Sequence, residues 1–199
     1  MIQKYSTAPQ WQSRGYLPHF QQPGSLQFIT YRTADSLPRQ YVHKVLQRIP
    51  ASHAEERRQA LEELLARCLG SCPLRNPVAA AIVQGNLLHH DGVKYRLLAW
   101  CVMANHVHVL IEVFEDFPLG KVLHSWKPFT AIQINALLGR SGTFWEREYF
   151  DRAMRDDEHL RRTIEYIENN PVICGICKRP EDYAFSSARW RMEGQRFAL

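Results

Sequence analysis

The fold is decided by one stretch of the chain, Val93-Lys-Tyr-Arg-Leu-Leu-Ala-Trp-Cys-Val-Met-Ala-Asn-His-Val-His-Val-Leu-Ile-Glu-Val113. Two apolar runs flank the short segment Met-Ala-Asn, and this pattern predicts two strands joined by a tight hairpin. Because successive side chains of a strand face opposite sides, His106 and His108 project from one face and Val107 and Val109 from the other. Two imidazoles held side by side can chelate a divalent cation, although buried histidines on strands often only satisfy hydrogen bonds.

Working outward, the rest of the chain alternates strand and helix patterns. We expect a strand over 25–33 and then three helical segments between 38 and 90, of which 54–69 and 77–90 are the clearest. Strands over 93–102 and 106–113 and a helix over 119–138 follow. An extended piece over 144–150 and a helix that starts after Asp156 complete the order. Helix 54–69 places leucines on one face and Glu and Arg on the opposite face. The last helix must stop at Pro171, because the residue before a proline avoids the helical region. This order predicts an α+β, ferredoxin-like (RRM-like) antiparallel sheet with helices packed on one side of it.

Length and composition predict a single domain. The chain has 199 residues, of which 45% are hydrophobic, enough for one full core. We expect residues 1–24 to form an N-terminal arm and residues 184–199 a C-terminal tail. No stretch has the length of a membrane span and the start of the chain lacks a signal core, so the sequence predicts a cytoplasmic protein with no membrane partner.

Charge and cysteines narrow the function only slightly. The net charge of +5 and the pI near 9.0 favour an anionic partner. The five cysteines are odd in number and sparse, which favours reduced, buried thiols over a disulfide framework. Cys174 and Cys177 have zinc-knuckle spacing, and Cys68 with Cys72 would complete four ligands, so structural zinc is the alternative.

The final predicted helix carries a polar sector beside its apolar stripe. At about 100° per residue, the side chains of His159, Thr163, Tyr166 and Asn170 fall within roughly 60° of one another. They therefore line the edge of the helix where it borders the sheet. A tyrosine in this position is typical of an amphipathic rim, and by itself it does not indicate catalysis.

Several segments together resemble the REP-associated tyrosine transposases, which belong to the single-tyrosine HUH class and have insertion-sequence transposases as relatives. The segments are Leu17-Pro-His-Phe20, the first strand with Asp35-Ser-Leu-Pro38, 95–100, Val102-Met-Ala-Asn-His-Val-His-Val-Leu110, Ser125-Trp-Lys-Pro-Phe-Thr130, Phe144-Trp-Glu-Arg-Glu-Tyr-Phe-Asp-Arg152, Tyr166-Ile-Glu-Asn-Asn-Pro-Val172 and 183–187. A His-hydrophobic-His triplet is common, whereas its combination with the later Tyr-Ile-x-x-Asn-Pro block is specific. The family usually has a proline where this chain has Ala104, a change that removes no chemistry.

The resemblance implies a metal-dependent transposase that nicks and rejoins single-stranded DNA through a 5′-phosphotyrosine intermediate. It implies that Tyr166 is the nucleophile on a C-terminal catalytic helix, and that His106, His108 and Asn170 bind Mg²⁺ or Mn²⁺. The implied partner is single-stranded DNA with hairpin-forming palindromic repeats, and the protein would be nucleoid-associated when bound to DNA. The protein would act as a monomer or a homodimer, with the tyrosine working in its own subunit or in the partner's.

Several alternatives stay open at this point. Glu112, on the histidine face of its strand, or a water could replace Asn170 as the third ligand, and Tyr149 is a competing nucleophile. We expect phosphate contacts from basic residues that are otherwise solvated charges, namely Lys121, Lys127, Arg147, Arg152 and Arg155. Arg189-Trp-Arg191 combines cations with an aromatic, as strand-binding surfaces do, or packs as a C-terminal segment. The rival functions are a non-catalytic DNA or RNA hairpin-binding protein and a metal hydrolase that uses activated water.

Overall fold

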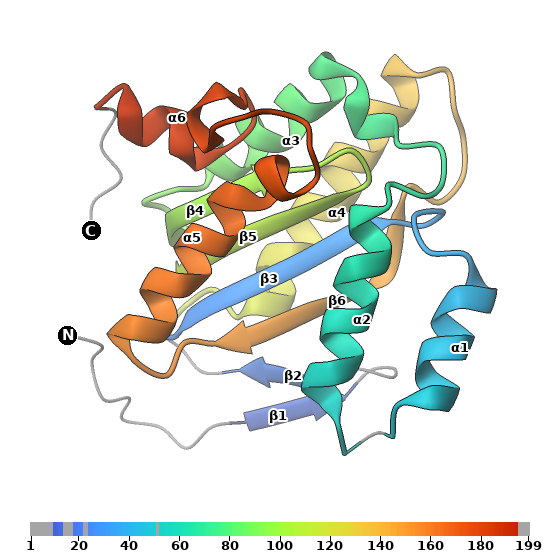
Figure 1. The fold of residues 1–199 in the computed structure, drawn as a ribbon. Helices are drawn as coiled ribbons and strands as arrows, with labels where there is room; N and C mark the ends of the chain where they lie inside the picture. Colours follow the sequence, from blue (N-terminus) through green and yellow to red (C-terminus); the bar gives the residue numbers. More distant parts are fainter. Residues whose placement is uncertain (1–9, 14–17, 22–23, 51, 195–199) are drawn as a thin grey trace.

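The sheet predicted around the histidine strand is present. The computed structural model describes residues 10–13, 18–21, 24–50 and 52–194 (Figure 1). Its main sheet consists of β3 (Leu26–Thr33), β4 (Tyr95–Val102), β5 (His106–Val113) and β6 (Trp145–Ala153), all antiparallel, in the order β4-β5-β3-β6. The first strand of this sheet thus lies between the third and the fourth, which confirms the ferredoxin-like arrangement. The extended piece predicted over 144–150 is longer than expected, because it pairs along β3 as far as Ala153.

The histidine strand occupies an inner position in this sheet. The hairpin between β4 and β5 is closed by the backbone N–H of Met103, which donates to the carbonyl of His106 at 2.8 Å. His108 lies opposite Cys101 on β4 and opposite Thr30 on β3. A side chain here is held by paired backbone on both sides, so its direction is fixed by the sheet rather than by a loop.

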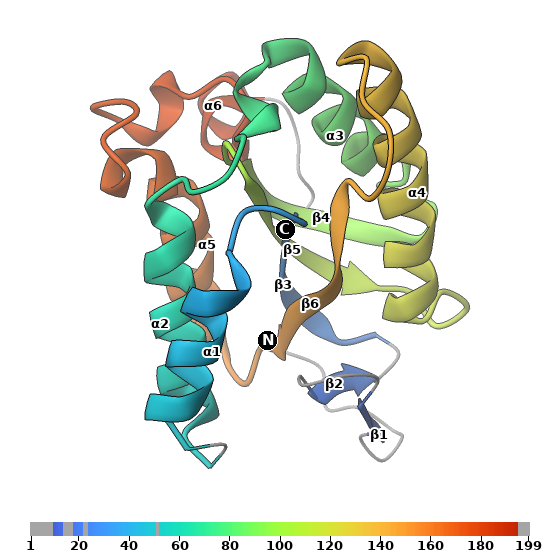
Figure 2. The same ribbon diagram turned by 90° about the vertical axis from the view of Figure 1, so that its right-hand side faces the viewer.

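Helices cover both faces of the sheet, so the prediction that they lie on one side is wrong. Helices α3 (Pro77–His89) and α4 (Leu119–Leu137) lie on one face, and α2 (Ala54–Ala66) and α5 (Asp157–Ile173) on the other (Figure 2). Helix α1 (Arg39–Arg48) lies beyond α2. The physical reason is visible in β4, where every residue from Leu97 to Val102 is buried, and a strand that is buried on both faces needs a layer on each side.

Helix α5 does not stop at Pro171, which corrects a second expectation. The helix runs on to Ile173 with Pro171 inside it. The backbone N–H of Cys174 still donates to the carbonyl of Asn170 at 3.0 Å, and that of Ile176 to Pro171 at 2.8 Å. The proline removes one donor without ending the helix, so Asn170 stays one helical turn from Tyr166.

Regular structure is also present near both limits of the described part of the chain. Strands β1 (Gln10–Ser13) and β2 (Pro18–Gln21) pair with each other, and the rest of the predicted arm before Gly24 lies outside the described residues. Toward the other end lies α6 (Ser187–Met192). Two short 3₁₀ helices, 73–75 and 180–182, come earlier in the chain, before α3 and before α6 respectively. No helix in the described part of the chain has the length and apolar content of a bilayer-spanning segment.

Helix α6 favours the packing interpretation of Arg189-Trp-Arg191. Trp190 packs edge-on against Trp100 of β4, with ring centroids 5.7 Å apart. Arg191 binds Glu168 of α5 at 2.7 Å and donates to the carbonyl of Leu98. Within the predicted tail, residues 195–199 lie outside the described part of the chain.

Candidate active site

The two histidines face each other within the sheet. The Nε2 atoms of His106 and His108 are 3.1 Å apart, and each residue is only 1% exposed. Val107 and Val109 belong to the core on the opposite face, as the strand alternation predicts. Two ring nitrogens that converge in this way can share a proton or bind a common cation.

A second set of contacts fixes the imidazoles from behind. The side chain of Asn105 donates its amide to the carbonyl of Leu69 at 3.1 Å, which turns its Oδ1 toward Nδ1 of His106 at 2.8 Å. An amide oxygen only accepts, so Nδ1 of His106 carries the proton and Nε2 keeps its lone pair. Nδ1 of His108 lies 2.8 Å from the hydroxyl of Thr30, which can donate or accept.

Burial keeps both rings neutral. It lowers the pKa of His106 to about 3, and burial, with smaller contributions from His106 and Arg58, lowers the pKa of His108 well below 6.5. A neutral imidazole is the form that binds metal ions. With both Nδ1 atoms engaged and both Nε2 atoms converging, the pair fits a divalent cation.

Helix α5 brings Tyr166 to the histidines. The ring of Tyr166 packs edge-on against His108 with centroids 5.4 Å apart, and against Phe28 at 6.0 Å. Phe28 also stacks on His108 at 5.5 Å. Residues of a strand and a helix that are about sixty positions apart in the sequence therefore form one site in a single chain.

Asn170 lies beside Tyr166, one turn further along α5. It is 5% exposed. Glu112, the alternative third ligand, pairs with Arg96 at 2.6 Å toward the far end of β5. It lies four residues beyond His108, which is about 13 Å along a strand, so the structure does not bring it to the histidine pair.

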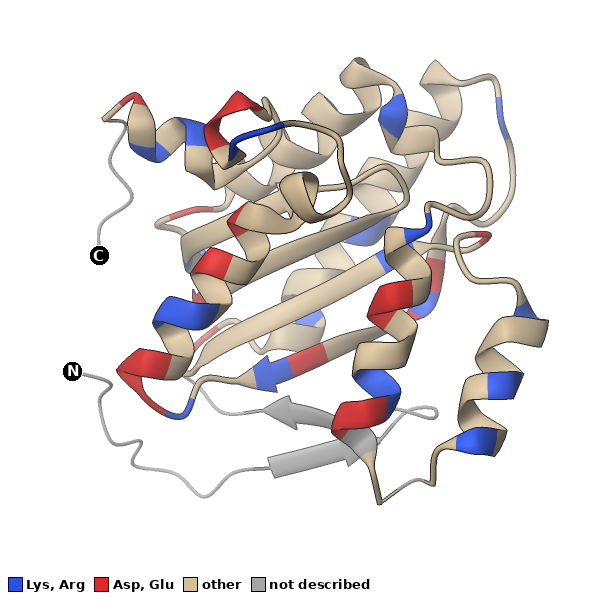
Figure 3. Ribbon diagram, in the orientation of Figure 1, with Lys and Arg blue, Asp and Glu red and all other residues tan. Residues whose placement is uncertain are grey.

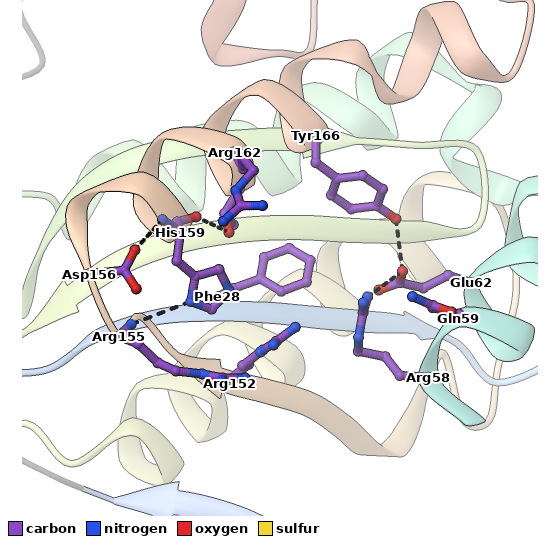
Figure 4. A pocket seen from close by; sticks show the side chains of 11 residues that line it. Phe28, Arg58, Gln59, Glu62, Arg152, Arg155, Asp156, His159, Arg162 and Tyr166 are labelled. Carbon is purple, nitrogen blue, oxygen red and sulfur yellow. Dashed lines mark hydrogen bonds and ion pairs between the residues drawn. The ribbon is translucent and has the colours of Figure 1, made fainter. Parts of the chain in front are cut away.

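A cavity of about 500 Å³ opens beside Tyr166 (Figure 4). It is lined by Phe28 of β3, by α2 and α5, and by the segment that joins β6 to α5. The lining residues are Phe28, Arg58, Gln59, Glu62, Arg152, Arg155, Asp156, His159, Arg162, Thr163 and Tyr166. Three members of the polar sector predicted on the last helix, His159, Thr163 and Tyr166, are therefore on one wall.

The five predicted phosphate contacts separate into two groups. Arg152 and Arg155 line the cavity. Lys121 is exposed on α4, on the opposite side of the sheet. Lys127 of α4 donates to the carbonyl of Arg147 at 2.9 Å and lies over the ring of Tyr149, and burial lowers the pKa of Lys127 to about 8.

Tyr149 does not share the site of Tyr166. It packs against the core between the sheet and α4, the face that carries Val107 and Val109. The alternation of β6 places Phe150 and Arg152 on the histidine face instead, because they pair with Thr30 and Phe28. The arrangement therefore favours Tyr166 over Tyr149 as the group that reaches the histidines.

The sequence did not indicate that a carboxylate contacts Tyr166. The hydroxyl of Tyr166 donates to Oε2 of Glu62 at 3.1 Å, and Arg58 binds the same carboxylate at 2.5 Å. The helical period places Glu and Arg opposite the leucines of this helix, yet the side chains of Arg58 and Glu62 are only 14% and 13% exposed. The spacing of Arg58, Glu62 and buried Leu65 at i, i+4 and i+7 was the available signal.

Charges of both signs alternate along the two helices that cover this face. Figure 3 shows acidic and basic residues interspersed on α2 and α5. Glu55 of α2 binds Arg58 at 2.5 Å and Arg152 of β6 at 3.1 Å, which links α2 to the sheet. Basic side chains around the cavity are thus partly paired within the protein.

Sequence comparison matches part of this chain to a known class of proteins. Residues 86–170 match the family described as Transposase IS200 like, a span that contains His106, His108, Tyr166 and Asn170. Over these residues the chain has the sequence pattern of an IS200-like transposase domain.

Within that class, the chain is similar to REP-associated tyrosine transposases. It is 26% identical over 113 residues to the REP-associated tyrosine transposase of Escherichia coli strain K12, covering 52% of this chain and 64% of the relative. It is 25% identical over 103 residues to a Haemophilus influenzae protein assigned to the same group, covering 47% of this chain and 58% of that protein. The match thus spans about three fifths of each relative. The predicted resemblance is confirmed.

A solved structure shares the fold. It is the structure of a REP-associated tyrosine transposase bound to a REP hairpin, which superposes with a TM-score of 0.52 and 17% sequence identity. The alignment covers 89% of this chain and 86% of that one. At this identity the likeness establishes the common fold, a four-stranded antiparallel sheet with packed helices.

Proposed function

We propose that this protein is a divalent-metal-dependent transposase that nicks and rejoins single-stranded DNA through a 5′-phosphotyrosine intermediate on Tyr166. The observation that carries the proposal is the convergence of the two neutral imidazoles, Nε2 to Nε2 at 3.1 Å, with the Tyr166 ring packed on one of them. The similarity to IS200-like transposases supports the same chemistry.

Three residues of the site would bind the metal ion. His106 and His108, with Asn170 as the third ligand, would hold Mg²⁺ or Mn²⁺. Such an ion, when bound, polarises a phosphodiester and offsets the charge that opposes attack on it. Imidazole ligands suit Mn²⁺ better than Mg²⁺, so we expect tolerance of more than one metal.

Tyr166 supplies the nucleophile. Its oxygen attacks the scissile phosphorus, the bond from phosphorus to the 3′ oxygen breaks, and a 5′-phosphotyrosine and a free 3′-hydroxyl result. The tyrosine gives up its proton and the departing oxygen gains one. Because the bond energy stays in the phosphotyrosine, a 3′-hydroxyl can reverse the step and rejoin DNA.

The proposed substrate is single-stranded DNA with hairpin-forming palindromic repeats. The structural relative is bound to a REP hairpin. In this chain, Arg152, Arg155 and Arg162 surround a cavity next to the tyrosine, which suits the phosphates of a strand that enters the site. Since Tyr166 packs on His108 of its own chain, we propose that the tyrosine acts within its own subunit.

The proposal is tested with end-labelled hairpin oligonucleotides incubated with Mn²⁺ or Mg²⁺ and resolved on a denaturing gel. We expect a protein-DNA adduct that disappears in Tyr166→Phe and after chelation of the metal. Cleavage that survives Tyr166→Phe without an adduct would instead indicate a hydrolase with activated water. Hairpin binding without cleavage would indicate a non-catalytic binding protein.

A further inference from the structure

Helix α2 places a buried carboxylate on the reacting atom of the proposed nucleophile. Figure 4 shows the Tyr166 hydroxyl pointing at Glu62, to whose Oε2 it donates at 3.1 Å. Glu62 lies outside residues 86–170, the span that matches the transposase family. The sequence similarity therefore assigns it no role.

The carboxylate of Glu62 is held by an ion pair, and one of its two oxygens can accept a further hydrogen bond. Arg58 binds Oε2 at 2.5 Å and is itself fixed by Glu55 at 2.5 Å and by the ring of Phe150, 5.5 Å from its guanidinium carbon. The other oxygen of Glu62, Oε1, is buried and has no hydrogen-bond partner within the described part of the chain. A fixed carboxylate with an unused acceptor next to a phenol is arranged to take a proton.

The resting tyrosine needs such an acceptor. A phenol has an ordinary pKa of about 10, so it carries its proton at neutral pH. The hydroxyl of Tyr166 is directed at Glu62. The attacking oxygen must lose its proton as it bonds to phosphorus.

We infer that Glu62 is a catalytic residue that accepts the phenolic proton as Tyr166 attacks, a role that rests on the proposed function. The proton moves from Oη of Tyr166 to the carboxylate while the bond from Oη to phosphorus forms and the bond from phosphorus to the 3′ oxygen breaks. The 3′ oxygen takes a proton from solvent. In rejoining, the carboxylic acid returns its proton to Oη.

The charged groups around Glu62 are compatible with this role. Burial raises the pKa of Glu62 above its ordinary value of 4.5, the adjacent Arg58 and the bond from Tyr166 oppose that rise, and Glu55 adds to it. The net direction is upward, which brings the base closer to working pH. Cleavage should therefore weaken as acid protonates Glu62.

The test measures single-turnover adduct formation against pH, at saturating hairpin oligonucleotide and Mn²⁺. We expect Glu62→Gln to slow the reaction about 10²–10⁴-fold near neutral pH, as loss of general base catalysis does. The acid limb of the wild-type profile should be absent in this variant.

Two further variants separate chemistry from structure. Glu63→Gln makes the same change at the next residue of α2, which is exposed, and should react like wild type. Glu62→Asp keeps a base and should recover part of the rate. This variant tests the assignment even if Glu62→Gln disturbs the fold around Arg58. Oligonucleotide affinity and circular dichroism spectra should be equal among the variants.

The outcomes are distinct. Unchanged or faster adduct formation in Glu62→Gln, with wild type active, would overturn the assignment and make Glu62 a restraint on the tyrosine. Absence of any Tyr166 adduct in wild type would overturn the proposed function itself, and with it the role of Glu62.

Discussion

The two faces of the same sheet differ in what their side chains are bound to. On one face, Val107 and Val109 pack with Trp126 and other apolar residues of α3 and α4 into an apolar core. On the other face, His106 and His108 lie among Thr30, Asn105, Tyr166 and the ion pairs of α2. Alternate residues of β5 thus belong to two different environments, one apolar and one polar.

Two adjacent substitutions on β5 should show the largest difference between the two faces of the sheet. We expect His108→Ala to lower adduct formation about 10³–10⁴-fold, because loss of a metal ligand forfeits several kcal/mol of transition-state stabilisation. Val109→Ala should cost roughly 2 kcal/mol of unfolding free energy and leave the rate of the folded protein unchanged. Single-turnover cleavage and urea unfolding of both variants measure the two effects. Equal losses of cleavage in both would show that the faces are not separate.

The apolar face offers the reverse experiment. Trp126 is fully buried and packs edge-on against Tyr95, with centroids 5.2 Å apart. Trp126→Ala should lower the free energy of unfolding by about 3–5 kcal/mol because it leaves a large cavity. Urea unfolding measures the loss, and adduct formation below the unfolding transition should match wild type. A large loss of cleavage by folded protein would place α4 in the catalytic machinery.

A hydroxyl on each face gives a finer test. Thr30 contacts Nδ1 of His108, whereas Thr130 on the opposite face accepts from Nε1 of Trp145 at 2.9 Å. Thr30→Val should weaken Mn²⁺ binding about 10–100-fold, because partners of metal-bound histidines fix their orientation and tautomer. Thr130→Val should affect stability and not metal affinity. Calorimetric titration of both variants with Mn²⁺ would contradict the account if the two affinities fell together.

The smallest effect concerns pH and stability without metal. His106 has a folded pKa of about 3, below its ordinary value of 6.5. Above pH 6.5 the ring is neutral in both the folded and the unfolded state, so proton uptake by His106 costs no stability. As the pH falls from 6.5 toward 3, the unfolded state binds a proton that the folded state does not, and the free energy of unfolding decreases. His106 alone should contribute about 2 kcal/mol to the loss of stability between pH 7 and pH 5.

Chemical denaturation in chelator measures this loss. His106→Gln should show a shallower decline with pH, whereas His124→Gln, exposed on α4, should keep the wild-type decline. An unchanged decline in His106→Gln would mean that His106 does not contribute to acid sensitivity.

Much of this contrast follows from local periodicity. The alternation of a strand is enough to place His106 and His108 together, and the helical period aligns Tyr166 with Asn170. The side of the sheet that a helix covers depends on tertiary packing, so the sequence pattern misplaced the helices. Pro171 was expected to end α5, but a missing donor is tolerated inside a packed helix.

The catalytic surroundings were harder to predict than the pair itself. Glu62 reaches Tyr166 across 104 positions of sequence, and nothing in the amphipathic pattern of α2 indicates which neighbour its polar side chains meet. Asn105 and Thr30 are ordinary polar residues in sequence. They gain their roles from the register of β3 against β5, which brings Thr30 opposite His108.

The most direct test of the central claim maps the adduct by mass spectrometry. After reaction with a hairpin oligonucleotide and Mn²⁺, nuclease trimming and trypsin digestion, Tyr166 lies in peptide 163–178 and Tyr149 in peptide 148–152, each as the sole tyrosine. The account predicts a residual 5′-phosphonucleotide on peptide 163–178. A modified peptide 148–152, or cleavage with no modified peptide, would contradict it.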